Sequence, residues 1–276
     1  MLKLLASSGL MDCNPSTTPM QTGLALKEPK EVVTEADERH FPYQSLVGQL
    51  IWLLGTRIDL SFPINVLTRY MSGWDAEAIS LLKRVIRYLK GKEKMGIVYL
   101  RSEKGEKIER ADEEPTKFTC VGDADHAGRV HDSKTTAGIM GFYADNAVSF
   151  GSKAHPIGVS TSSSQSEGVT CKMACQSVEF TSGQLAELKI RGKGPIPLYQ
   201  DNRSVICLAA NPVNHKRSKH YRIAMHYVRD LVLRGVVKIQ YLETLLMKAD
   251  LLTKATSEKR LNDLLKMCRF GYVDSF

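Results

Sequence analysis

The stretch Gly122–Gly128 (GDADHAG) decides how this sequence is expected to fold. It follows an apolar run that begins at Phe118, so we predict a strand that delivers the carboxylate of Asp123 into a turn of small residues. An acid at this point is poorly placed for a hydrophobic core and well placed for a metal ion. Three more carboxylates can gather around it from distant parts of the chain: Glu167, Asp201 and Asp250.

Composition points to a globular protein with a polyanionic partner. The 276 residues are 43% hydrophobic and 25% charged, which is enough for two domains with a real core. The net charge of +8 favours a polyanion, although an ordinary basic protein is an equally good interpretation. The six cysteines lack Cys-x-x-Cys spacing and no signal peptide precedes them, so we expect a reducing compartment inside the cell. The longest apolar run, Leu46–Leu54, is too short to cross a bilayer, and no membrane is expected.

The first part of the chain is predicted to be helical after an extended lead-in. Residues 1–42 combine two proline turns with a charged run, which is typical of a lead-in without regular structure. Apolar residues then recur at helical spacing, and we expect helices over 43–57, around 61–71 and over 75–90. A short strand at Gly96–Leu100 and a polar loop follow. We therefore predict a helical connection or thumb-like segment at 43–112 and a second domain at 113–276.

The second domain has the pattern of an α/β fold. Strand signals recur three times in succession, and helical segments then alternate with two further strands. The expected strands are 117–122, 136–143, 147–152, 196–199 and 236–242; the expected helices are 167–188, 202–210 and 223–234, with two closing helices that start near Lys248 and Ser257. This order predicts a mixed five-stranded sheet with flanking helices, and ligands of such sheets lie outside the strand ends.

Gathered carboxylates predict a site for two divalent cations. Acids within metal reach of one another repel, and they stay ionised together only when cations lie between them. Hard oxygen ligands select Mg²⁺ or Mn²⁺, and two such ions about 4 Å apart support phosphodiester hydrolysis. We expect Asp123 to bridge the ions and Asp250 to hold the ion that activates water. Glu167 and Asp201 are then expected to hold the ion nearer the leaving group. Each acid alone also fits a role as turn former or helix cap, and spacing supports no more than a candidate metal nuclease.

Basic residues cluster most densely before the helix expected at 223–234. The cluster consists of Lys216, Arg217, Lys219 and Arg222. Contact with nucleic-acid phosphates explains this cluster, because neutralising the charge of the phosphate backbone needs clustered positive charge. A solvent-exposed start of the helix explains it equally well. The neighbouring histidines lack the partner cysteines of a structural zinc site. Cys171 and Cys175 share a helix face, where we prefer a buried apolar role to metal binding.

Two groups of short motifs follow one another in a fixed order. The first group is Asp12–Pro15 (DCNP), Thr17–Met20 (TTPM), Tyr43–Gly48 (YQSLVG), Thr56–Leu60 (TRIDL) and Lys83–Gly91 (KRVIRYLKG). The second is Asp123–Asp125 (DAD), Ser152-Lys153, Ser166-Glu167, Asp201–Ser204 (DNRS), Asn211-Pro212, Ser218–His220 (SKH), His226–Arg229 (HYVR) and Ala249–Lys254 (ADLLTK). Together they resemble the C-terminal part of the Pol polyprotein of copia-type LTR retrotransposons. The first group is similar to the end of its reverse transcriptase and the connection region, and the second to its RNase H.

This resemblance implies an RNase H-like fold and a ribonuclease H activity. The implied reaction is cleavage of the RNA strand of RNA–DNA hybrids during reverse transcription, by a two-metal mechanism that leaves 3′-hydroxyl and 5′-phosphate ends. The resemblance assigns the four acids to the four catalytic motifs and adds Asn202 and Arg203 to the expected nucleic-acid contacts. It implies the upstream reverse transcriptase domain of the same polyprotein as a partner, and a location in cytoplasmic virus-like particles or the nucleus. The paired aspartates of a polymerase palm are absent, so no polymerase activity is expected.

Two other functions remain open. One is a catalytically degenerate retroelement fragment that folds and binds nucleic acid without cleaving it. The other is a related fold that cuts DNA, as integrase-like proteins do. A set of four acids in place of three argues against the second.

Overall fold

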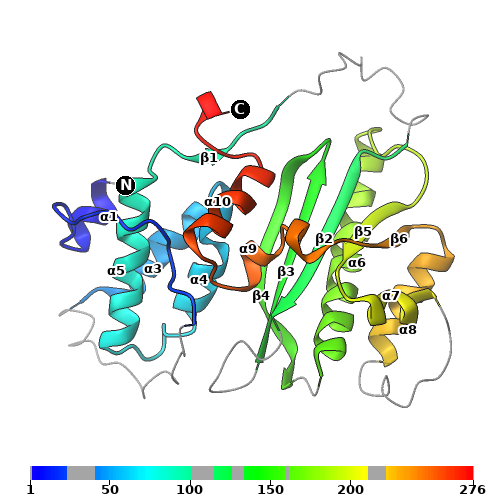
Figure 1. Cartoon of the computed structure of the whole chain (residues 1–276), viewed down its shortest axis with the longest axis horizontal. Coiled ribbons are helices and arrows are strands. Elements are labelled where there is room, and N and C mark those ends of the chain that lie inside the picture. The colour runs from blue at the N-terminus through cyan, green and yellow to red at the C-terminus, as the bar shows by residue number, and fades with distance from the viewer. Residues whose placement is uncertain are drawn as a thin grey trace. The chain divides into compact units, whose positions relative to one another are not determined.

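The computed structural model describes residues 2–23, 41–100, 115–125, 134–159, 162–210 and 222–275, and these form two compact units (Figure 1). The first unit takes the described residues up to Val98 together with those from Lys254 onward, and the second takes the described residues from Tyr99 to Thr253. The domain boundary predicted near residue 112 lies outside the described ranges. Unlike the predicted division, the structure groups the C-terminal residues from Lys254 with the first unit.

Helices make up most of the first unit. They are α1 (Leu2–Ser7), α3 (Tyr43–Ile51), α4 (Ser61–Thr68), α5 (Ala76–Gly91) and α10 (Glu258–Met267), with the 3-10 turns η1 (Trp52–Gly55), η2 (Ile58–Leu60) and η5 (Val273–Ser275). The longest, α5, begins where predicted, because the carboxylate of Asp75 accepts a hydrogen bond of 2.9 Å from the backbone N–H of Ala78. Its apolar face, which includes Leu82 and Ile86, is fully buried. The helix expected over 43–57 instead ends at Ile51 and continues as the 3-10 turn η1.

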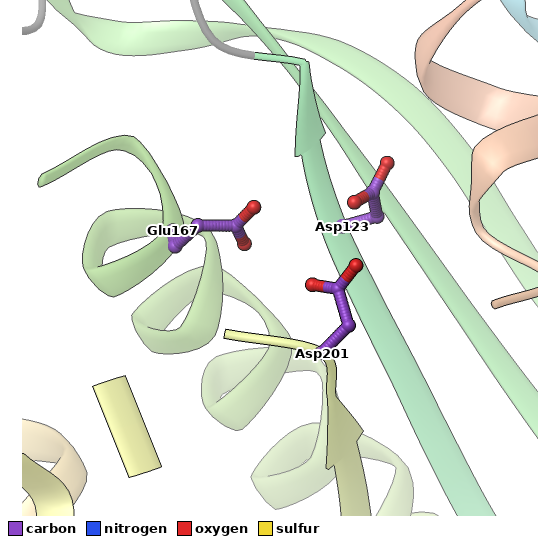
Figure 2. A group of neighbouring side chains, drawn as sticks. All are labelled: Asp123, Glu167 and Asp201. Atoms are coloured by element: carbon purple, nitrogen blue, oxygen red, sulfur yellow. The ribbon is translucent and has the colours of Figure 1, made fainter. Parts of the chain in front are cut away.

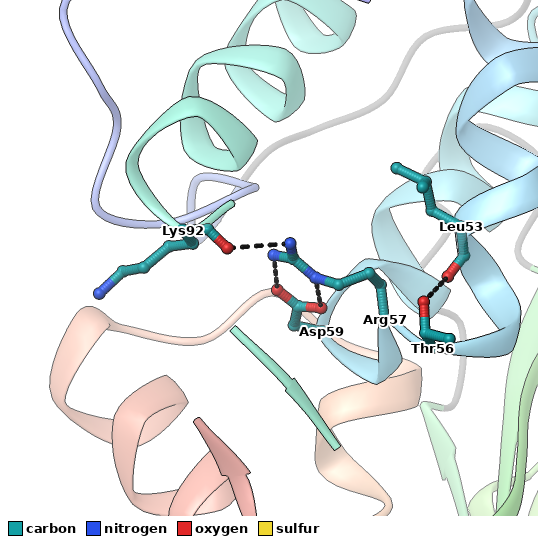
Figure 3. A network of polar contacts seen from close by, with 5 residues as sticks. All are labelled: Leu53, Thr56, Arg57, Asp59 and Lys92. Atoms are coloured by element: carbon teal, nitrogen blue, oxygen red, sulfur yellow. Dashed lines mark hydrogen bonds and ion pairs between the residues drawn. The ribbon is translucent and has the colours of Figure 1, made fainter. Parts of the chain in front are cut away.

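The buried side chain of Arg57 is hydrogen-bonded to Asp59 and to the backbone of Lys92 in the first unit (Figure 3). Nε and Nη2 of Arg57 donate hydrogen bonds of 3.0 and 2.7 Å to the two carboxylate oxygens of Asp59, and Nη1 donates one of 3.0 Å to the carbonyl of Lys92. The guanidinium also lies 5.5 Å from the ring centroid of Phe270. Phe270 belongs to β7 (Phe270–Gly271), which pairs antiparallel with β1 (Gly96–Ile97). These contacts explain why the C-terminal residues pack with the first unit.

The second unit is built on a five-stranded mixed sheet in the order β4-β3-β2-β5-β6. The strands are β2 (Phe118–Asp125), β3 (Lys134–Tyr143), β4 (Asn146–Val159), β5 (Ile196–Gln200) and β6 (Val237–Tyr241). The first three form an antiparallel meander, whereas β5 pairs parallel with β2 and β6 parallel with β5. Ala144 and Asp145, both with positive φ, make the two-residue turn between β3 and β4. The mixed five-stranded sheet with flanking helices confirms the predicted α/β class.

Helices cover both faces of this sheet. They are α6 (Ser163–Glu187), α7 (Arg203–Ala210), α8 (Arg222–Leu233) and the short α9 (Asp250–Thr253), with the 3-10 turn η4 (Thr244–Leu246). The core between α6, α8 and the sheet contains Val178, Leu198 and Val228. The helix α6 starts four residues before the predicted position, because Ser162 caps it by accepting a hydrogen bond of 3.2 Å from the backbone N–H of Gln165. In the described ranges, every helix falls short of the length and apolar character that a bilayer span requires.

The Arg57 network generates a stability prediction. The Arg57 and Asp59 side chains are only 6% and 0% exposed, so the change Arg57→Met leaves a buried carboxylate without its counter-charge. We expect this variant to lose about 3 to 5 kcal/mol of unfolding free energy in urea denaturation. The double variant Arg57→Met/Asp59→Leu should recover part of the loss. Lys259→Met, an exposed cation on α10, is the control, and an equal loss in that control would contradict the prediction.

Candidate metal centre

Strand pairing brings two of the predicted acids to the same edge of the sheet. In the parallel pair of β2 and β5, Val121 lies opposite Tyr199. Two residues further along, Asp123 still lies in β2, whereas Asp201 is the first residue after the end of β5. Asp123 lies within β2, opposite Gly138 of β3, and not in the turn predicted to follow the strand. The strand continues past Asp123 because β3 supplies backbone partners as far as Asp125.

The third acid comes from the amino-terminal part of α6. A Cβ atom built at Gly122 would lie 3.3 Å from Cβ of Ala174, so the absence of a side chain there lets α6 pack closely on β2. The hydroxyls of Thr135 and Ser166 form a hydrogen bond of 2.9 Å that joins β3 to the start of α6. Glu167 follows Ser166 directly, and both contacts therefore hold its carboxylate near the sheet edge.

Asp123, Glu167 and Asp201 form a compact group of carboxylates (Figure 2). One oxygen from each lies within 4.8 Å of the others. Asp123 and Glu167 are only 4% and 5% exposed, and Asp201 is partly exposed. Charges at this separation repel strongly when water is excluded, and a cation between them removes the repulsion. The all-oxygen donor set fits Mg²⁺ or Mn²⁺, and in the described part of the chain this is the only such group of His, Cys, Asp or Glu side chains.

Asp250 lies outside this group. It is the first residue of α9 and is only 3% exposed. Three residues further on, Thr253 donates a hydrogen bond of 2.5 Å to Oδ2 of Asp123, so α9 packs beside the centre although its acid is not a member of the 4.8 Å group. Thr253 lies in the ADLLTK motif but was not among the site residues predicted from the sequence.

The other predicted site residues divide into three cases. Asn202 caps α7, since its Oδ1 accepts hydrogen bonds from the backbone N–H groups of Ser204 and Val205 at 3.0 and 3.3 Å. Arg203 is exposed, with its guanidinium 4.7 Å from the ring centroid of Tyr241, and Arg222 is exposed at the start of α8. The remaining cluster residues, Lys216, Arg217 and Lys219, lie outside the described ranges. Tyr241 was missed, and so was Thr244, whose hydroxyl donates to Oδ2 of Asp201 at 3.3 Å.

The cysteines near Glu167 belong to the core, which confirms the role predicted for Cys171 and Cys175. Cys120, Cys171 and Cys175 are at most 1% exposed. A hydrogen bond with Cys175, and then burial, raise the pKa of the Cys171 thiol, and burial raises the pKa of the Cys120 thiol. Both thiols therefore remain protonated near neutral pH, and their part in the centre is to pack α6 against β2.

The chain resembles known proteins in sequence and in fold. It is 31% identical over 264 residues to the retrovirus-related Pol polyprotein from transposon RE1 of Arabidopsis thaliana, a match that covers 93% of this chain and 16% of that protein. It is 25% identical over 262 residues to the retrovirus-related Pol polyprotein from transposon TNT 1-94 of Nicotiana tabacum, covering 94% and 19%. The chain thus spans less than a fifth of the length of these relatives. No protein-family model matches it.

Two solved structures are among those to which about half of this chain is similar. One is RNase H1 from the archaeon Halobacterium salinarum NRC-1, with a TM-score of 0.37 and 19% identity over 53% of this chain and 98% of that one. The other is LC11-RNase H1 in complex with an RNA/DNA hybrid, with a TM-score of 0.38 and 13% identity over 50% of this chain and 94% of that one.

Thiol labelling tests the packing role of the cysteines. Because Cys120 and Cys171 are buried and protonated, a maleimide reagent at pH 7.5 should modify the exposed Cys207 of the folded protein and spare these two. Peptide mass spectrometry identifies the modified residues, and labelling in denaturant shows that every thiol can react. Labelling of Cys171 in the folded chain at the rate of Cys207 would contradict the prediction.

Repulsion among the three carboxylates predicts that a bound divalent cation stabilises the folded chain. We expect Mg²⁺ to raise the melting temperature, with about 2.7 kcal/mol of stabilisation at a concentration one hundred times its Kd. Glu167→Gln removes one of the repelling charges, so this variant should melt at a higher temperature than the unchanged chain in EDTA and gain less from Mg²⁺. Glu187→Gln, the same change at the exposed end of α6, serves as the control and should behave as the unchanged chain does. Equal Mg²⁺ responses in all three proteins would rule out a cation at this centre.

Proposed function

Because this chain is related in sequence to the Pol polyproteins of copia-type transposons, we propose that its second unit is a magnesium-dependent ribonuclease H. It cleaves the RNA strand of RNA–DNA hybrids during reverse transcription. The observation that supports this proposal most directly is the meeting of Asp123, Glu167 and Asp201, which lie in three separate acidic motifs of the sequence. The upstream reverse transcriptase domain of the same polyprotein is the proposed partner.

The three carboxylates are the proposed cation ligands in this reaction. Asp123 and Glu167, which are buried, and Asp201, which is partly exposed, would hold the divalent cations. Two divalent cations held by these acids would supply a water nucleophile and would stabilise the leaving 3′-oxygen of the cleaved bond. Asp250 is the proposed fourth ligand. The products carry 3′-hydroxyl and 5′-phosphate ends.

Positive charge beside the acids supports a nucleic-acid substrate. Arg203 follows two residues after Asp201. Its positively charged guanidinium lies over the ring of Tyr241, and this cation–π contact restrains the charge near Asp201. Arg222 adds an exposed charge at the start of α8, and the whole chain carries a net charge of +8. We assign these side chains, together with Asn202, Lys216, Arg217 and Lys219, to the phosphate backbone of the hybrid, which proteins read by shape and charge more than by base sequence.

Cleavage of a labelled hybrid tests the proposal. The full chain, incubated with an RNA–DNA hybrid that carries a 5′ label on the RNA, should shorten the RNA in Mg²⁺ and not in EDTA. Asp201→Asn removes one of the three carboxylate charges, so its cleavage rate should fall to the level of the EDTA control while hybrid affinity is kept. Asp145→Asn, the same change at an exposed turn between β3 and β4, should cleave as the unchanged chain does.

The same assay separates the two rival functions. Binding of the hybrid without metal-dependent cleavage by the unchanged chain would favour a degenerate fragment that only binds nucleic acid. Cleavage of duplex DNA in place of the hybrid would favour an integrase-like nuclease. Either result would overturn the proposed activity.

A further inference from the structure

The carboxylate of Asp123 accepts a hydrogen bond from the hydroxyl of a residue that is distant in the sequence, Thr253. Oγ1 of Thr253 donates to Oδ2 of Asp123 at 2.5 Å, and the Thr253 side chain is fully buried. The same hydroxyl lies 3.5 and 3.4 Å from the carbonyls of Ala249 and Asp250, the usual acceptors for a threonine in a helix. The shorter bond to a charged acceptor is the stronger one, so the hydroxyl is directed to Asp123.

The lack of a side chain at Gly138 lets α9 approach β3 closely and so places Thr253 near Asp123. It lies directly opposite Asp123 in the pairing of β2 with β3, so the two residues share one face of the sheet. A Cβ atom at Gly138 would come within 2.8 Å of both Cβ of Leu252 and Cγ2 of Thr253, and within 3.0 Å of the carbonyl oxygen of Ala249. Only glycine therefore allows α9 to lie flat against β3.

Buried side chains in and next to α9 hold the helix against β3. Met247, Ala249 and Leu252 are fully buried around it. The ammonium of Lys248 lies 4.2 Å from the ring centroid of Phe142 on β3, which is a favourable cation–π distance. The position of the Thr253 hydroxyl is consequently set by packing on both sides of the helix.

We propose that Thr253 is a positioning residue for Asp123, and that α9 and Gly138 together form its support. The inference rests on the proposed function, in which Asp123 is a cation ligand. An ionised carboxylate offers about four acceptor sites, and the Thr253 hydroxyl uses one of them on Oδ2. The hydrogen bond fixes the rotation of the carboxylate group about its bond to Cβ. Groups that orient a metal ligand in this way change metal affinity or activity by about 10- to 100-fold when they are removed.

The test uses two substitutions at Thr253 in the full chain. Thr253→Val keeps the shape of the side chain and removes its hydroxyl, whereas Thr253→Ser keeps the hydroxyl. In Thr253→Val, we expect the Mg²⁺ concentration that gives half of the maximal rise in melting temperature to increase about 10- to 100-fold. We also expect kcat for hybrid cleavage to fall with KM for the hybrid unchanged. Thr253→Ser should restore both properties.

Two further variants separate positioning from general stability. Thr170→Val removes another fully buried threonine hydroxyl, one that makes no hydrogen bond, and should leave the Mg²⁺ response unchanged. Gly138→Ala should displace α9 while the Thr253 side chain keeps its hydroxyl. It should weaken the Mg²⁺ response as Thr253→Val does.

The outcomes distinguish this inference from the proposed function. If the unchanged chain does not cleave hybrids, the proposed function fails, whereas the Mg²⁺ melting series still tests Thr253. An unchanged Mg²⁺ response in folded Thr253→Val would overturn the inference. Failure of Thr253→Ser to restore the response would also overturn it, because the hydroxyl would then not be the group that matters.

Discussion

Parallel pairing of β2 with β5 is the constraint on which the metal centre depends. It pairs Val121 with Tyr199, and each of the acids Asp123 and Asp201 follows two residues after its member of that pair. A slip of one residue in β2 would turn Asp123 to the other face of the sheet, because side chains alternate along a strand. Cys120 and Leu198, which are paired in this register, are both buried in the core beneath α6. Apolar packing on one face therefore fixes the register of the two strands that carry Asp123 and lead to Asp201.

The three neighbouring carboxylates repel one another, and hydrogen bonds from hydroxyl groups, together with close packing, hold them in place. Thr253 donates to Asp123, and Thr244 donates to Asp201. The Thr135–Ser166 pair holds the start of α6, from which Glu167 extends. These groups orient the acids without adding a charge of their own. The three carboxylates, with one oxygen from each within 4.8 Å of the others, are compatible with metal binding.

Regular structure was largely predictable because it follows local periodicity. Each strand of the five-stranded sheet was expected from its apolar pattern, and α5 from its spacing and its cap at Asp75. Some differences arose where partners far away in sequence extend an element, as when β3 prolongs β2 through Asp123, whereas the earlier start of α6 has a local cause, the cap at Ser162. The grouping of the C-terminal residues with the first unit has the same origin, because the contact of Arg57 with Phe270 joins residues that no local pattern relates.

The sequence by itself determined the α/β class, the alternation of strands and helices, and the identity of the candidate acids, because each depends on side-chain type and short-range spacing. Tertiary structure alone decided which acids meet: Asp123, Glu167 and Asp201 approach one another, and Asp250 lies outside their group. It also decided that Thr253 bonds to Asp123, a residue 130 positions away. Such contacts depend on how closely helices pack on the sheet at Gly122 and Gly138, where the space left by a missing side chain, and no periodic pattern, sets the distance.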